Sequence, residues 1–91
     1  MVVTVKLGDP LWKATGQKVV RVSLDSARTV SDLFAEMGRR YPAFGEAVQR
    51  AEYDLPYTLF RNESLVDWAQ IGQTPLADGD QIFVFLPVSG G

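Results

Sequence analysis

Two consecutive glycines, Gly90 and Gly91, form the end of the 91-residue sequence and are the residues best suited to chemistry. A terminal glycine carboxylate has no side chain on its α-carbon, so it is the least hindered acyl group that a protein can offer to another protein's active site. Two glycines also reach extended backbone conformations that residues with a Cβ atom cannot adopt, as passage through a narrow channel requires. Such an ending suits activation as an acyl-adenylate, followed by attack of a sulfur or an amine.

The alternative is that the two terminal glycines have no function, because small residues are tolerated at frayed termini. At ordinary glycine usage, a terminal pair arises by chance in roughly one chain in 200. The tail alone therefore leaves both interpretations open, and the rest of the chain has to separate them.

Most other chemistry is excluded by residues that the sequence lacks. It contains no cysteine and no histidine, which rules out a disulfide, an iron–sulfur cluster, a zinc-finger site and thiol or imidazole catalysis. No nucleophile–base pair, phosphate loop or metal-ligand spacing is present, and no metal site is predicted. Asp78 and Asp80 resemble a catalytic carboxylate pair or a cation loop, but hydrogen bonding within a turn is the better interpretation. We predict that the chain is not an enzyme by itself.

Charge and hydropathy exclude some classes of binding partner. The formal net charge is -2, and the nine lysines and arginines are scattered, so no nucleic-acid partner is expected. No apolar run approaches the ~18 residues of a membrane span, and the first residues do not resemble a signal peptide. The sequence predicts a cytoplasmic protein without a membrane partner.

Hydrophobic patterning predicts the elements that must position the tail. Alternating apolar residues indicate strands over 2–7 and 18–24, joined by a long loop, and further strands over 57–61 and 81–86, with a brief return over 65–68. An apolar stripe predicts a helix over 27–41, with Thr29 as N-cap and Asp32 completing a capping box. A short second helix is expected over 43–51.

This order predicts an α+β roll of the ubiquitin-like kind, with one main helix and a short second helix across a mixed sheet of four to five strands. The first and last strands would lie parallel in the centre, because a central parallel strand is apolar on both faces, as 82–86 is. We expect one domain over 1–86 and a flexible tail over 87–91.

Two sequence motifs resemble a known family. The stretch 75–82, PLADGDQI, holds a turn of the form PL-x-DGD, and the chain then ends in Pro87, Val88, Ser89, Gly90 and Gly91. Together they resemble the C-terminal signature of the MoaD/ThiS-type ubiquitin-like sulfur carriers, closest to the small subunit of molybdopterin synthase. The resemblance implies a β-grasp fold. The sequence departs from the family pattern at Leu86, where a second proline is common. It also departs in its extra residues over 8–17 and 41–56.

The resemblance also implies a function. Gly91 would be adenylated by an ATP-dependent activating enzyme of the ubiquitin-activating kind and converted to a thiocarboxylate. The sulfur would then pass to an acceptor, with the large subunit of molybdopterin synthase as the first expectation. ATP and zinc would belong to the activating partner, so this chain would bind no cofactor.

Related tails leave other functions open. Similar endings occur in carriers for thiamine, cysteine synthesis and tRNA thiolation, and in modifiers that form an isopeptide bond between the last glycine and a lysine. A plain interaction module with an incidental tail is a third alternative.

A partner interface is expected on the last strand. Phe85 corresponds to an aromatic residue that lies at enzyme interfaces in the molybdopterin carrier. If Ile82, Val84 and Leu86 face the helix, the side chains of Phe83 and Phe85 face the other way. Phe60 joins them with less support. The alternative is that neighbouring strands or loops cover these side chains. Weaker candidates for contact with an acidic partner are Arg61 and the pair Arg39 and Arg40.

Overall fold

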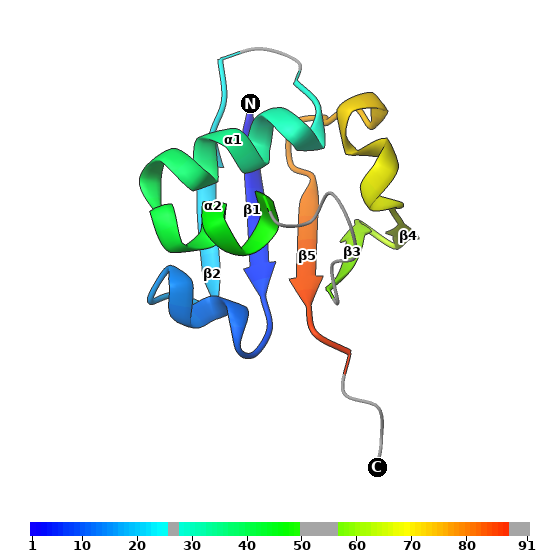
Figure 1. Cartoon of the computed structure of the whole chain (residues 1–91). Coiled ribbons are helices and arrows are strands. Elements are labelled where there is room, and N and C mark those ends of the chain that lie inside the picture. The colour runs from blue at the N-terminus through cyan, green and yellow to red at the C-terminus, as the bar shows by residue number, and fades with distance from the viewer. Residues whose placement is uncertain (26–27, 50–56, 88–91) are drawn as a thin grey trace.

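The chain folds into one mixed sheet with two helices on one of its faces (Figure 1). The computed structural model describes residues 1–25, 28–49 and 57–87. Its elements, in chain order, are β1 (Val2–Leu7), a 3-10 turn η1 (Leu11–Ala14), β2 (Val19–Ser23), α1 (Val30–Arg40), α2 (Pro42–Gln49), β3 (Thr58–Arg61), β4 (Ser64–Leu65), a 3-10 helix η2 (Trp68–Gln73) and β5 (Gln81–Phe85).

The strand order β2-β1-β5-β3-β4 confirms the expected β-grasp topology. β1 and β5 lie side by side in the centre and run parallel, with Val5 paired to Ile82, whereas the other neighbouring strands are antiparallel. Figure 1 shows the two central arrows pointing the same way. The last strand is therefore held on both edges before the chain continues toward its end.

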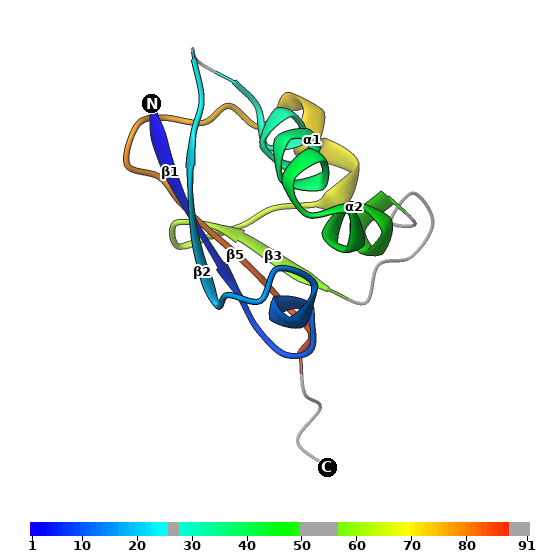
Figure 2. The same cartoon turned by 90° about the vertical axis from the view of Figure 1, so that its left-hand side faces the viewer.

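The hydrophobic core lies between the sheet and the helices. The strands contribute alternate residues, such as Val3 and Val5 of β1 and Ile82 and Val84 of β5, all fully buried. The stripe predicted on α1 faces them through Val30, Leu33, Phe34 and Met37. Full burial of such a side chain contributes about 1.5–3 kcal/mol, so these residues supply a large favourable term that offsets the conformational entropy lost on folding. Seen edge-on in Figure 2, both helices lie on the same side, which leaves the opposite face of the sheet open.

The start of α1 confirms the predicted capping box. The Thr29 hydroxyl accepts a hydrogen bond from the Asp32 backbone N–H at 3.3 Å, and the Asp32 carboxylate accepts one from the Thr29 N–H at 3.0 Å. The backbone hydrogen bond from Thr29 holds the pKa of Asp32 below its usual value. The cap sets the start of α1 at Val30 rather than at residue 27.

The segment between β3 and β5 differs from the expectation of a return strand followed by a loop. β4 is only Ser64–Leu65, and residues 68–73 form a 3-10 helix. The Asp67 side chain accepts from the Ala69 N–H at 2.9 Å and so caps this helix. The Trp68 indole donates to the Tyr57 carbonyl at 2.7 Å, and its ring lies 5.5 Å from that of Phe34. These contacts turn the chain onto α1, which ends the strand early.

Candidate functional site

Three phenylalanines gather on the open face of the sheet, as the sequence predicted. Phe83 and Phe85 alternate with the buried Ile82 and Val84 of β5, and Phe60 of β3 is paired in register with Phe83. The Phe83 and Phe85 rings meet edge-on with centroids 4.7 Å apart, and Phe60 stacks on Phe85 at 6.0 Å. We call Phe60, Phe83 and Phe85 the aromatic cluster.

The aromatic cluster is accessible from outside the molecule. The Phe83 side chain is 41% exposed, while Phe60 and Phe85 are half-buried. The helices lie on the other side of the sheet (Figure 2), so the alternative that neighbouring elements cover these rings is wrong for Phe83. A contiguous exposed aromatic surface is typical of protein interfaces. Partner contact by these residues stays a prediction.

Gly8, the residue directly after the predicted strand over 2–7, makes room for the cluster. Its backbone N–H donates to the Val84 carbonyl at 2.9 Å, so it continues the pairing of β1 with β5. A Cβ atom on Gly8 would lie 2.7 Å from the Phe85 Cβ, closer than real side chains approach one another. Nothing local in the sequence signals this contact, since it joins residues that meet only when the two central strands pair.

The Gly8 contact predicts a measurable loss of stability. We expect Gly8→Ala to shift β5 and the Phe85 ring and to lower the free energy of unfolding by about 1–3 kcal/mol, as overpacking does. Gly72→Ala is the matched control, because a Cβ atom on Gly72 meets nothing within 4 Å, and it should change stability by less than about 0.5 kcal/mol. Urea unfolding of both variants measures the difference, and equal midpoints would contradict the account.

Asp80 holds the beginning of β5 through hydrogen bonds of its carboxylate. Its buried carboxylate accepts hydrogen bonds from the Ala77 backbone N–H at 2.8 Å, the Asn62 amide at 3.0 Å and the Arg61 Nε at 2.8 Å. The hydrogen bond from Ala77 lies within the turn, as the turn-bonding interpretation expects, whereas Arg61 and Asn62 donate from β3 and from the turn that follows it. The bond to Asp80 assigns Arg61 a structural role, so the weaker expectation that Arg61 serves an acidic partner lacks support.

Asp78 accepts its hydrogen bond from outside the turn, so the turn-bonding interpretation is wrong for this residue. Its carboxylate accepts from the Val2 backbone N–H at 2.7 Å, which ties the turn to the start of β1. Gly79 between the two aspartates has φ +84°, the left-handed conformation expected there. Both aspartates are thus engaged with the backbone or with structural partners.

The environment of Asp80 predicts acid sensitivity. Burial raises the pKa of Asp80, but hydrogen bonds from Asn62, Ala77 and Arg61, together with the Arg61 charge, outweigh it, and the pKa is lowered overall. The pKa of Asp80 in the folded protein lies below the unfolded value of about 3.9. The ionised Asp80 carboxylate therefore stabilises the fold at pH values above about 3.9, and this stabilisation is lost as the pH falls through the folded pKa.

Replacing Asp80 tests this network. We expect Asp80→Ala to cost about 2–4 kcal/mol at pH 7, because three donors lose their acceptor. Asp78→Ala, which releases one exposed backbone donor, should cost about 1 kcal/mol. Urea unfolding at pH 7 and at pH 3 should show the Asp80→Ala penalty shrinking at the lower pH, and a penalty that does not change with pH would contradict the pKa direction.

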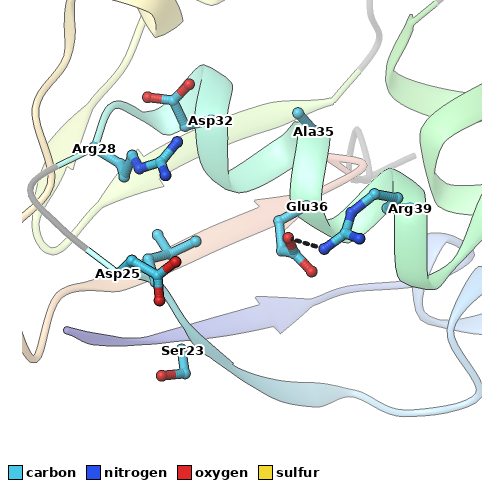
Figure 3. A pocket seen from close by; sticks show the side chains of 8 residues that line it. Ser23, Asp25, Arg28, Asp32, Ala35, Glu36 and Arg39 are labelled. Atoms are coloured by element: carbon cyan, nitrogen blue, oxygen red, sulfur yellow. Dashed lines mark hydrogen bonds and ion pairs between the residues drawn. The ribbon is translucent and has the colours of Figure 1, made fainter.

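A polar groove lies between the end of β2 and α1 (Figure 3). Ser23, Asp25, Arg28 and Arg39 are among the residues that line it. Several of its charges are already engaged within the protein, since Glu36 pairs with Arg39 and with Arg40, and Asp32 serves the helix cap. Across residues 1–25, 28–49 and 57–87, no group of three acidic, cysteine or histidine side chains is placed to hold a metal ion. The groove therefore has the features of a structural surface.

The predicted tail begins where β5 ends. After Phe85 the chain has no regular structure at Leu86, which is half-buried, or at Pro87, which is exposed. The other predicted tail residues, 88–91 with Gly91 among them, lie outside the described residues, so the boundary at 86/87 stays a prediction. In the part of the chain that is described, no helix has the length and apolar character of a membrane span.

Comparisons with known proteins agree with this architecture. The model of the ThiS family matches residues 5–91. Small archaeal modifier protein 1 (SAMP1) from Haloferax volcanii is 31% identical, with a TM-score of 0.80 over 100% of both chains. CysO from Mycobacterium tuberculosis is 25% identical, with a TM-score of 0.75 over 94% of this chain and 99% of that one.

A more distant match shares the fold. In the complex of subunits 1 and 2 of molybdopterin-converting factor from Helicobacter pylori, the matching chain is 22% identical, with a TM-score of 0.64 over 100% of both chains. A search of curated protein sequences finds no match. The central parallel strands, the open aromatic face and the family match extending to Gly91 lead to one conclusion: the chain belongs to the ThiS family of ubiquitin-like sulfur carriers.

Proposed function

We propose that this protein is a sulfur carrier whose Gly91 carboxylate is activated and loaded by partner enzymes. The observation that carries the proposal is the ThiS family match, which runs through the body and continues to Gly91. The aromatic cluster supports it, because the exposed Phe83 and the half-buried Phe85 lie on the last strand, with Phe85 six residues before that glycine. Six extended residues span about 20 Å, so a partner that binds the cluster can reach the terminal carboxylate.

The chemistry has two steps. A Gly91 carboxylate oxygen attacks the α-phosphorus of ATP, which releases pyrophosphate and leaves a glycyl-adenylate. Hydrosulfide from a sulfur donor then attacks the carbonyl carbon, the C–O bond to AMP breaks, and a proton is released as the thiocarboxylate forms. The absence of a side chain on Gly91 leaves this carbon open to both partners.

The carrier supplies the acyl group and a recognition face, and its partners supply catalysis. Binding of ATP and of zinc belongs to the activating enzyme, and the whole cycle takes place in the cytoplasm. Molybdopterin synthesis is the destination that we propose. The Helicobacter pylori protein of the same fold is described in a complex of subunits 1 and 2 of molybdopterin-converting factor, which supports a second subunit as the sulfur acceptor.

Pyrophosphate exchange tests the proposal. The purified chain is mixed with the activating enzyme encoded in the same genome, ATP and labelled pyrophosphate. Exchange that depends on the chain is the expected result, since adenylate formation is reversible. No exchange above the level of the enzyme alone, with a folded chain, would overturn the proposal.

A second function is favoured by one comparison. SAMP1, which is 31% identical over the whole chain, is described as a small archaeal modifier protein. In a modifier, a lysine amine attacks the activated Gly91 in place of sulfur and forms an isopeptide bond. A denaturing blot for the chain should then show conjugates of high molecular mass that disappear when Gly91 is deleted. Carriers for thiamine, cysteine or tRNA thiolation differ from the first proposal only in the acceptor.

A further inference from the structure

The acidic residues of this protein all lie outside the strands of its sheet. Eleven acidic residues outnumber nine basic ones, yet the five strands contain no aspartate or glutamate. Their charged residues are Lys6, Arg21 and Arg61. Arg61 is paired with Asp80 on the helix side. The remaining two cations belong to the open face.

Lys6 and Arg21 lie beside the aromatic cluster. Lys6 is paired in register with Phe83, and Arg21 is paired with Thr4, two residues before Lys6 on the same face of β1. Residues paired across neighbouring strands have Cβ atoms about 5 Å apart, and diagonal neighbours about 7–8 Å. Lys6, Arg21 and Phe83 therefore form one continuous surface.

Both cations are available to a partner. The Lys6 and Arg21 side chains are exposed, and within the described ranges neither forms an ion pair. The open face thus has an aromatic half on β5 and β3 and a cationic half on β1 and β2. A surface of one charge sign on a chain of opposite net charge selects a partner by electrostatic complementarity.

We propose that the activating enzyme presents an acidic surface to this face, with carboxylates opposite Lys6 and Arg21 and an apolar patch over Phe83. The inference rests on the proposed function and adds the chemistry of its partner. Opposite charges speed association and fix the orientation of the docked carrier, whereas burial of Phe83 supplies affinity. The cationic half fixes the orientation of the docked carrier, and with it the position at which the tail enters the active site.

Other occupants fit the face less well. A second copy offers no carboxylate from its own sheet to Lys6 and Arg21, because the five strands contain no aspartate or glutamate. A nucleic acid contacts many phosphates at once, and affinity grows with the number neutralised, but among the described residues the strands place only these two cations on the open face. The three rings are also packed against one another rather than separated for base stacking.

Charge reversal with a matched control tests the inference. Lys6→Glu/Arg21→Glu is compared with Lys13→Glu/Arg28→Glu, which makes the same change in net charge at exposed residues outside the sheet. In pyrophosphate exchange with the cognate activating enzyme at low salt, the first pair should raise the KM for the carrier about 10–100-fold and leave kcat within about twofold. The control pair should change KM less than about threefold. The difference should shrink at high salt, where screening is strong.

The outcomes separate the two proposals. Exchange by the wild type with equal KM values for the two double variants overturns this inference and leaves the proposed function standing. No exchange by the wild type overturns both. Thermal unfolding checks that each variant folds. If Lys6→Glu/Arg21→Glu fails to fold, the neutral Lys6→Gln/Arg21→Gln variant replaces it, and its KM should lie between the wild-type value and the value expected for the charge-reversed variant. The inference is also overturned if the chain binds a single-stranded RNA oligomer more tightly than it binds the activating enzyme, and if that RNA binding is lost when Lys6 and Arg21 are replaced.

Discussion

Deletion of Gly90 and Gly91 is expected to lower the rate of pyrophosphate exchange by at least about a thousandfold. The deletion moves the terminal carboxylate back by two residues, which span about 7 Å of extended chain. A displacement of about 1 Å from a reacting position already costs about a hundredfold. The new terminal residue, Ser89, also places a Cβ atom beside the carbonyl carbon that ATP and sulfur must approach.

The fold serves as the internal control for this deletion. Every buried hydrophobic residue in the described part of the chain lies between Val3 and Val84, so the thermal midpoint should be unchanged. Gly91→Ala keeps the length of the chain and adds only a methyl group, and its rate should fall between those of the wild type and the deletion. Exchange by the deletion variant within tenfold of the wild-type rate would show that the glycines are incidental.

Replacement of Phe83 has the second largest expected effect. Phe83→Ser should raise the KM of the carrier for the activating enzyme about 30–150-fold, as loss of an aromatic hot spot worth about 2–3 kcal/mol does. The side chain is 41% exposed, and its neighbours Ile82 and Val84 hold the core without it. The free energy of unfolding should therefore change by about 1 kcal/mol or less.

Val2→Ser is the matched control for Phe83. Val2 is 46% exposed on the same open face of the sheet, at the opposite end of β1 from Gly8. Its replacement also removes an exposed apolar side chain, but KM should stay within about threefold of the wild-type value. Similar KM values for the two variants would mean that the aromatic cluster does not contact the enzyme.

Much of the body could be predicted because its signals are local. Alternation places Val3, Val5 and Leu7 on one face of β1, and Thr29 with Asp32 marks the start of α1. The uninterrupted apolar run of β5 identified the central parallel strand. Each of these features depends on the types of a few neighbouring residues, so the sequence alone is enough to predict it.

The features that could not be predicted depend on residues far apart in the chain. Trp68 ends a strand because its indole reaches Tyr57 and Phe34. Gly8 is needed because Phe85 lies against it across the central strands. The cationic half of the open face joins Lys6 and Arg21 through the register of β1 and β2. Scattered in sequence, these two residues gave no signal until the pairing was known.

The mass of the intact protein from its native cells tests the central claim most directly. If Gly91 carries sulfur, part of the purified chain should be about 16 Da heavier than its sequence requires, since sulfur replaces one oxygen. That species should disappear in cells that lack the activating enzyme and should never form on the chain without Gly90 and Gly91. A single unmodified mass in cells that produce the activating enzyme and a sulfur acceptor would contradict the account.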